Sequence, residues 1–172
     1  ILVNGTAHPY LDCPAQVVRL RLLNASTARY YPFGFEGNVP FQVIASEGGL
    51  LDAPVTMDRI MLSSGERVEL LLDLTGMEGD SLLLMSYGSE LPMTMPGSNN
   101  LLWESSSLNG IDFPILRIRV GQPTADPITT IPATLANVQP YPEASAALTR
   151  IKEITGNGMV GGMSMFMLNG QG

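Results

Sequence analysis

The segment that most constrains the fold is the run Val17–Leu23. Its apolar side chains recur at every second position, which places Val18, Leu20 and Leu22 on one face and two arginines on the other. A period of two is typical of a β-strand with one face in a core and the other in contact with water. Asn24 ends the run, because its short side chain bonds its own backbone and favours a turn. We therefore predict a strand here, and we expect it to be a central strand of a β-sandwich.

Further strand-like segments follow at intervals of roughly ten residues, separated by turn-forming sequences such as Asn4-Gly5, Gly48-Gly49 and Ser63–Glu66. This rhythm is typical of an antiparallel sandwich, so we predict an all-β fold. A hairpin is predicted where Glu36-Gly37-Asn38 joins two of the segments. The predicted strands are 1–3, 30–35, 41–45, 59–62, 67–73, 81–86 and 114–120.

The remaining stretches of the chain have other patterns. Residues 88–110 indicate a long loop, with one helical turn expected around Trp103. The proline- and threonine-rich stretch that follows the last sandwich strand indicates an extended linker across a surface. A strand is predicted at 148–154, then a glycine-rich loop at 156–162 and a final apolar segment at 165–170.

Composition excludes several classes of function. The hydrophobic fraction of 45% suffices for a core, while no apolar run approaches the length of a membrane span. A net charge of −7 without a basic cluster argues against nucleic acid and membrane as partners. The single cysteine cannot form an internal disulfide bond. No signal peptide is visible, and because the first residue is Ile1 we expect a piece of a longer protein.

The two ends of the chain share a short pattern of three apolar residues followed by Asn-Gly. It occurs at Ile1–Gly5 and at Phe166–Gly170, so Asn4 and Asn169 lie 165 positions apart. This spacing is about the length of one domain. Chance explains a five-residue pattern easily. A tandem array of similar domains, with one whole unit and the first hairpin of the next, explains it equally well.

Five motifs occur along the chain in a fixed order: Ile1–Gly5, Pro9-Tyr10-Leu11, Arg19–Ser26, Gly48–Leu51 with Pro54-Val55, and Gly65–Glu69 with Asp73. In this order they resemble the second cupredoxin-like domain of the bacterial three-domain multicopper oxidases. That group includes spore-coat laccase, copper-efflux oxidase and bilirubin oxidase. The resemblance covers residues 1 to 87, is looser over 114–142, and resumes at 148–170.

The resemblance implies a cupredoxin-like Greek-key β-sandwich over 1–121, an extended inter-domain linker over 122–147, and the truncated opening hairpin of a following cupredoxin domain over 148–172. It also implies that the whole protein is an exported, copper-dependent oxidoreductase. Such an enzyme oxidises a phenolic substrate or a metal ion at a type 1 copper and reduces dioxygen to water at a trinuclear cluster. In that family the copper ligands lie in the first and third domains, so the expected partners here are the flanking cupredoxin domains of the same polypeptide.

The chemistry of this chain agrees with a copper-free domain. A blue-copper centre takes two histidines, a cysteine and a weak axial ligand, whereas His8 and Cys13 are the only residues of their types. We interpret His8 as a surface or hydrogen-bonded residue, and Cys13 as a small buried thiol rather than a nucleophile. We therefore expect no catalytic, cofactor-binding or metal-binding residue and no cofactor in this chain, with copper held elsewhere in the whole protein.

The charged residues of the predicted strands are interpreted as surface residues without a catalytic role. Glu66, Glu69 and Asp73 share one strand region, where carboxylates are usually solvated, and Glu66 is expected to bond backbone or Arg67 at the turn. The two arginines of the first strand, Arg19 and Arg21, are expected to pair with acidic residues on a solvated or inter-domain face. These groups are not expected to be catalytic.

Methionine is the one ambiguous feature of the sequence. Thioethers suit Cu(I), and copper-efflux oxidases, to which the chain is similar, use Met-rich segments near their substrate site. Methionine also fills irregular gaps in cores and between domains, and we favour that interpretation. The residues concerned are Met93 and Met95 in the long loop and Met159, Met163, Met165 and Met167 near the end of the chain.

Two functions remain open at this point. The first is the structural middle of an oxidase. The alternative is a domain of a non-enzymatic, exported cupredoxin-like scaffold or binding protein that has lost its copper. In either case we expect the hairpin at 148–170 to pack on a neighbouring molecule or to swap between chains, giving a homo-oligomer.

Overall fold

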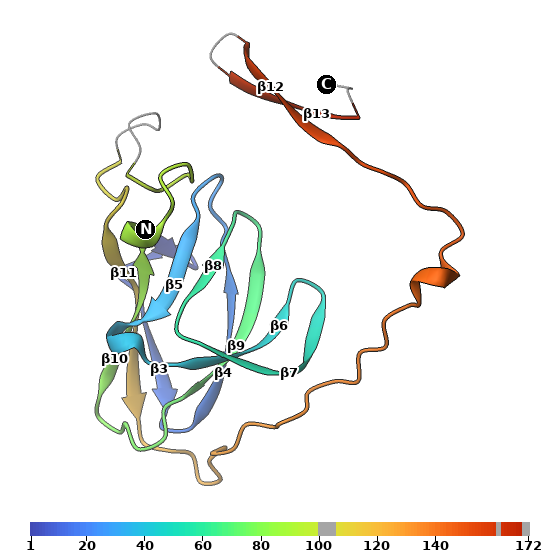
Figure 1. Cartoon of the computed structure of the whole chain (residues 1–172). Helices are drawn as coiled ribbons and strands as arrows, with labels where there is room; N and C mark the ends of the chain where they lie inside the picture. The colour runs from blue at the N-terminus through green and yellow to red at the C-terminus, as the bar shows by residue number, and fades with distance from the viewer. Residues whose placement is uncertain (100–105, 161–162, 170–172) are drawn as a thin grey trace. The chain divides into compact units, whose positions relative to one another are not determined.

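The computed structural model describes residues 1–99, 106–160 and 163–169, and Trp103 with its predicted helical turn lies outside these ranges. Two compact units are present, Ile1–Val138 and Gln139–Gly172. The first unit is a sandwich of two sheets with a small hairpin at its N-terminus (Figure 1). This hairpin joins β1 (Leu2–Val3) to β2 (Thr6–Ala7). The predicted all-β, cupredoxin-like sandwich is confirmed.

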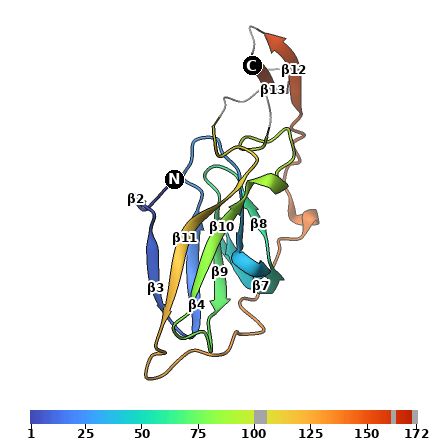
Figure 2. The same ribbon diagram turned by 90° about the vertical axis from the view of Figure 1, so that its left-hand side faces the viewer.

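The first sheet has five strands in the order β3-β11-β10-β5-β8. Its edge strand β3 runs parallel to β11, and the other neighbours are antiparallel (Figure 2). The chain leaves β10 through a 3₁₀ turn, η2 (Gly88–Glu90). The strands are β3 (Tyr10–Pro14), β5 (Tyr31–Phe35), β8 (Ile60–Leu62), β10 (Ser81–Tyr87) and β11 (Asp112–Gly121).

The second sheet has four antiparallel strands in the order β4-β9-β6-β7. Along residues 67–73 of this sheet, buried side chains alternate with more exposed ones, as the period of two in the sequence predicted. Phe41 of this sheet meets Phe35 of the other edge-to-face, with ring centroids 5.8 Å apart, so aromatic rings join the two layers. The strands are β4 (Val17–Leu23), β6 (Phe41–Ser46), β7 (Gly49–Met57) and β9 (Arg67–Asp73).

The prediction that residues 17–23 form a central strand is wrong. The segment is a strand, but β4 lies at the edge of its sheet and pairs, among the described residues, with β9 alone. Alternation of apolar and polar residues reports which face a side chain occupies. It does not report how many neighbouring strands lie beside it in the sheet, so the central position could not be derived from the pattern.

The predicted hairpin between residues 30–35 and 41–45 is also wrong. The two strands, β5 and β6, belong to different sheets. Between them lies a short 3₁₀ turn, η1 (Glu36–Asn38), in which Gly37 (φ 71°) and Asn38 (φ 57°) adopt left-handed backbone conformations. These conformations turn the chain across the core to the opposite layer, where a hairpin turn would have kept it in one sheet.

Residues 122–138 cross from one edge of the four-stranded sheet to the other. Near the start, Val17 N–H donates to the Ile128 carbonyl at 2.7 Å, at the outer edge of β4. Near the end, Leu135 N–H donates to the main-chain oxygen of Asp52 at 2.8 Å, and Val138 N–H donates to its Oδ1 at 3.1 Å. The chain is thus fixed along the sandwich up to the residue at which the first unit ends.

Replacing Asp52 with alanine is expected to release the end of this segment, because the carboxylate bond to Val138 is lost while the main-chain bond to Leu135 can persist. Exchange of the Val138 amide proton should accelerate by about tenfold, which corresponds to one hydrogen bond of about 1.4 kcal/mol. Hydrogen-exchange NMR measures this. Asp126→Ala, within the same segment, should leave the Val138 amide unchanged; an equal acceleration in both variants would contradict the assignment to Asp52.

The second unit contains an antiparallel pair, β12 (Ile154–Val160) and β13 (Met163–Leu168), preceded by a 3₁₀ turn, η3 (Glu143–Ser145). The strand predicted at 148–154 begins only at Ile154, and most of the predicted loop at 156–162 is strand. After β13, Asn169 has φ 53°, close to the φ of 50° at Asn4 after β1. The repeated pattern thus ends in the same local conformation at both sites. The predicted domain boundaries stay a prediction.

Candidate functional site

A groove lies along the seam between strands β3 and β4. Each is the edge strand of its own sheet. A tight turn joins them, in which Gln16 N–H donates to the Pro14 carbonyl at 2.9 Å. Because no strand among the described residues pairs with both β3 and β4, the two sheets are not joined along this side, and the groove lies between them.

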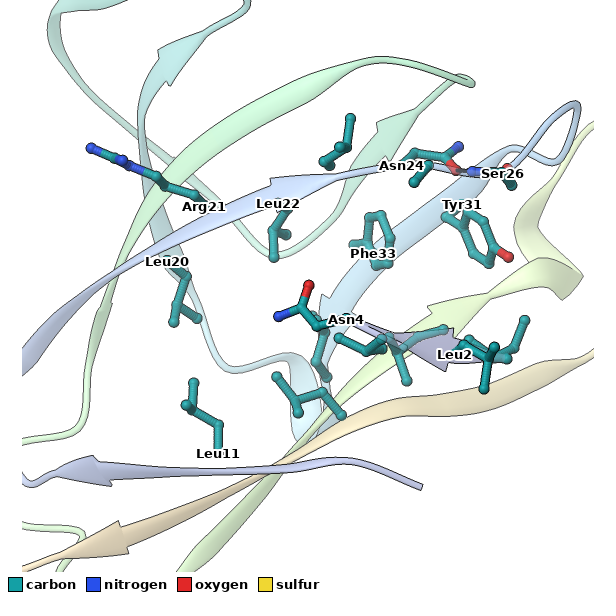
Figure 3. A pocket seen from close by; sticks show the side chains of 17 residues that line it. Leu2, Asn4, Leu11, Leu20, Arg21, Leu22, Asn24, Ser26, Tyr31 and Phe33 are labelled. Carbon is teal, nitrogen blue, oxygen red and sulfur yellow. Dashed lines mark hydrogen bonds between the residues drawn. The ribbon is translucent and has the colours of Figure 1, made fainter. Parts of the chain in front are cut away.

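The groove has a volume of about 590 Å³ and a mainly apolar lining. Leu20 and Leu22 point into it from β4, while Arg21 points away (Figure 3). The rings of Tyr31 and Phe33 stack at 5.4 Å and line its inner part. The N-terminal residues Ile1–Asn4, Leu11 of β3, and Ile115 and Leu116 of β11 complete the apolar lining.

The burial of facing residues shows that the cover over β4 is incomplete. Leu70 of β9 is 1% exposed, whereas Leu20, its cross-strand partner on the same face of the sheet, is only half-buried. The same contrast holds between Val68, which is buried, and its half-buried partner Leu22. Neighbouring residues on one face differ in this way when the layer above them ends, so the groove is a gap in the second layer.

One end of the groove is closed by a buried amide, Asn24, which is 2% exposed. Its Nδ2 donates to the carbonyls of Arg29 at 2.7 Å and Leu62 at 3.0 Å. Its Oδ1 accepts from the Ser26 hydroxyl at 2.6 Å and from the Ser26 N–H at 3.1 Å. Both N–H groups of the Asn24 amide donate within the fold, and its oxygen accepts two hydrogen bonds within the fold. Asn24 therefore shapes the end of the groove and has no hydrogen-bonding group left for a ligand.

The two arginines of β4 lie on the opposite face of the strand from the groove. Arg19 forms an ion pair with Glu69 of β9, and Arg21 Nε lies 3.2 Å from the other oxygen of the same carboxylate. The predicted pairing with an acidic residue is confirmed, while the choice between a solvated and an inter-domain face stays a prediction. Two positive charges therefore share one negative charge beside the outer edge of the sheet.

The structure places His8 on the surface and confirms Cys13 as a buried thiol. His8 is exposed in the link before β3, with φ 50°, whereas Cys13 is buried in β3. Burial raises the pKa of the Cys13 thiol, and the adjacent Asp12 charge raises it further, so the thiol stays protonated at neutral pH. Among residues 1–99, 106–160 and 163–169, no three His, Cys, Asp or Glu side chains are grouped so that they could hold a metal ion.

The carboxylates singled out in the sequence support turns. Glu66 Oε2 accepts the Ser63 N–H at 2.5 Å, which confirms the predicted backbone bond at that turn. Asp73 Oδ1 accepts the Thr75 N–H at 3.0 Å after β9. Neither points into the groove.

The methionines are only partly described. Met93 is exposed in the long loop, and Met95 is half-buried. The side chains of Met159, Met163, Met165 and Met167 lie outside the described side chains, so the choice between packing and Cu(I) binding stays a prediction.

One charged cluster was not predicted from the sequence. Arg119 of β11 makes two hydrogen bonds to Asp12 of β3, at 2.6 and 2.8 Å, and its guanidinium lies 3.6 Å from the centre of the Tyr10 ring. The parallel register that places Asp12 opposite Arg119 creates the pair. Because 107 positions separate the two residues in the chain, no local pattern indicates it.

The hydrogen bonds from Arg119, and then its charge, hold the pKa of Asp12 below its usual value. A lowered pKa in the folded state gives a contribution to stability that is present above the ordinary pKa and is lost as the pH falls through the lowered value. In Arg119→Leu, the titration midpoint of the Asp12 carboxyl should rise toward the value of an unpaired aspartate. Carbon-13 NMR titration measures it; Arg117→Leu is the control, and an equal rise there would contradict the pairing.

Comparison with known proteins identifies the family. The sequence profile described as Multicopper oxidase matches residues 9–100, which is more than half of the chain. The chain belongs to the multicopper oxidase family. The match covers strands β3 to β10 and includes both edges of the groove.

The three relatives compared below are all much longer than this chain. A protein named Cell division protein FtsP from Edwardsiella tarda is 36% identical over 156 residues, which are 87% of this chain and 30% of that protein. A laccase from Bacillus subtilis is 38% identical over 84 residues, or 49% of this chain and 16% of the laccase. The crystal structure of the McoA multicopper oxidase from Aquifex aeolicus matches with a TM-score of 0.74 and 30% identity, over 99% of this chain and 34% of that one.

The chain thus spans about a third of the length of these relatives or less. Within the part of the chain that the structure describes, no helix has the length and apolar character needed to cross a membrane.

Proposed function

We propose that this chain is the copper-free middle domain of a multicopper oxidase-like protein, in which it holds the neighbouring cupredoxin domains at a fixed spacing. The observation that carries the proposal is the donor content of the sequence. A blue-copper centre takes two histidines and one cysteine, and this sequence has one of each in total. His8 and Cys13 also differ in exposure, since one is on the surface and the other is in the core.

The proposed role is mechanical, and the chain has features suited to it. Its sandwich has a continuous core, and its exit segment is fixed to Asp52 up to the last residue of the first unit. A segment fixed along a rigid sandwich transmits a defined spacing, whereas a free linker would give a broad distribution of distances. In this proposal β12 and β13 open a following cupredoxin domain.

For the whole protein, the proposal is an exported oxidase. Copper in the flanking domains would take electrons one at a time from a phenolic substrate or a metal ion and would reduce dioxygen to water. The likeness to a protein named laccase and to a structure named multicopper oxidase supports this assignment. No electron transfer step is assigned to residues of this chain.

The test is copper content together with oxygen consumption by the whole protein, measured before and after copper removal and reloading. Bound copper and oxygen uptake with a phenolic or Cu(I) substrate, both lost on copper removal and restored on reloading, are expected. Absence of both after reloading would overturn the oxidase assignment. Cell fractionation of the same protein tests export, and recovery in the cytoplasm alone would contradict it.

A second candidate function is supported by the relatives. The protein named Cell division protein FtsP matches 87% of this chain, while the laccase matches 49%. In this alternative the whole protein is a non-enzymatic, exported scaffold, and the domain keeps its spacing role without copper nearby. A protein that binds no copper but whose deletion impairs cell division would favour the alternative over the oxidase.

A further inference from the structure

The outer edge of β4 presents backbone groups that no neighbouring strand satisfies. On the inner edge, the Gln16 carbonyl accepts from Leu74 N–H and Asn24 N–H donates to Glu66, so even-numbered residues face β9. Val17 N–H instead donates outward, to Ile128. Because backbone groups alternate with a period of two, those of Arg19, Arg21 and Leu23 also point outward, into the seam. Among the described residues, β4 has no strand partner on that side.

The face of β4 that adjoins this edge lacks a complete cover. Leu20 and Leu22 are half-buried beside a groove of about 590 Å³, although their partners on β9 are buried. An additional strand beside β4 would place every second side chain next to these leucines, on the face that lines the groove. It would therefore satisfy the backbone edge and cover the open side of the leucines at the same time.

The chain itself shows that this edge accepts extended backbone. Residue Ile128 of the exit segment bonds to Val17 at one end of β4. The edge from Arg19 to Leu23 continues the same line of outward backbone groups. Its two arginine side chains form ion pairs with Glu69 on the outer face of the sheet.

We propose that the edge of β4 from Arg19 to Leu23 is a strand-addition site, completed by one extended strand from a neighbouring domain of the whole protein. The strand carries apolar side chains toward Leu20 and Leu22. On the outer face it carries acidic side chains, because within the described residues Arg19 and Arg21 share the single carboxylate of Glu69, which can balance only one of their two positive charges. That the strand comes from a neighbouring domain rests on the proposed function. The open backbone groups and the charges of the β4 edge do not depend on that function.

The test uses the full 172-residue chain and a synthetic peptide, acetyl-Glu-Ile-Glu-Val-Glu-Ile-amide. Hydrogen exchange is followed by NMR with and without peptide at about 1 mM, a concentration suited to a weak complex. The amides of Arg19, Arg21 and Leu23 should slow by about tenfold or more, since each gains a hydrogen-bond acceptor. Those of Leu20 and Leu22, already paired with β9, should not change.

Two controls distinguish backbone pairing along β4 from non-specific binding of the peptide through its apolar side chains. A peptide with N-methylated glutamates keeps the charge and side chains but loses the N–H donors that face β4, and should give no protection. Leu23→Pro removes one outward donor without removing a bond to β9, and should weaken binding while the NMR spectrum stays folded.

The proposal is overturned if the three amides are unprotected, if the methylated peptide protects them equally, or if Leu23→Pro binds unchanged. Copper and oxygen measurements on the whole protein decide the proposed function separately. A failed oxidase assay leaves the amide result standing, and unprotected amides leave the oxidase result standing.

Discussion

Leu70→Ala should lower the free energy of unfolding by about 3 kcal/mol, within the usual range for a leucine truncated in a packed core. Leu70 lies in β9 between the two neighbouring strands of its sheet, and it is 1% exposed beneath the opposite layer. Truncation would leave a cavity that the rigid sandwich cannot fill. Chemical denaturation followed by circular dichroism measures the loss.

The matched control is Leu20→Ala, on the same face and directly across the strand pair. Because Leu20 is half-buried beside the groove, water can occupy the space, and the loss should be about 1 kcal/mol. Equal losses at Leu20 and Leu70 would mean that the layer over β4 is complete in solution, and the groove would then not exist as described.

Asn24→Ala should also cost about 3 kcal/mol, for a polar reason. The substitution removes the amide that donates to the carbonyls of Arg29 and Leu62, in a place where Asn24 itself is 2% exposed. The Arg29 carbonyl then keeps the bond from the Ser26 hydroxyl at 2.9 Å, so the larger part of the loss is expected at the Leu62 carbonyl. Each buried carbonyl that loses its partner costs about 1–3 kcal/mol. The same denaturation experiment measures the effect, and exchange of amides between β4 and β5 should accelerate with it.

Ser26→Ala serves as the control for this network. It removes the hydroxyl that donates to Asn24 but leaves both carbonyls bonded, so about 1 kcal/mol is expected. If Asn24→Ala proved as mild as Ser26→Ala, water would have to enter and satisfy the freed carbonyls, and the end of the groove would be open rather than closed.

The strands themselves could be predicted from local sequence, and the arrangement of β5 and β6 could not. Residues 67–73 alternate over seven positions and form β9 over that same range. Between β5 and β6, the sequence Glu36-Gly37-Asn38 indicates only that the chain turns. Whether it turns within one sheet or crosses to the other depends on the positions of β8, β9 and β10, which are set by residues far away in the chain.

At the candidate site, too, one feature could be predicted from the sequence and another could not. One histidine and one cysteine are too few for a blue-copper centre built from this chain, and that count needs no structure. The groove was not predicted, although Leu20 and Leu22 were assigned to an inward face. Leu20 and Leu70 both stand at apolar positions of an alternating strand, although one is half-buried and the other is buried. The alternation therefore gave no indication of a gap above β4.

The sequence by itself determined the class of fold and the faces of the main strands, because these depend on neighbours two to four positions apart. It also determined the family resemblance, because the order of five motifs along the chain is read without any structure. Only the tertiary structure decided that β4 is an edge, that the exit segment ends on Asp52, and that Arg119 meets Asp12. These depend on strand order and register between distant segments, which long-range packing selects and local periodicity does not encode.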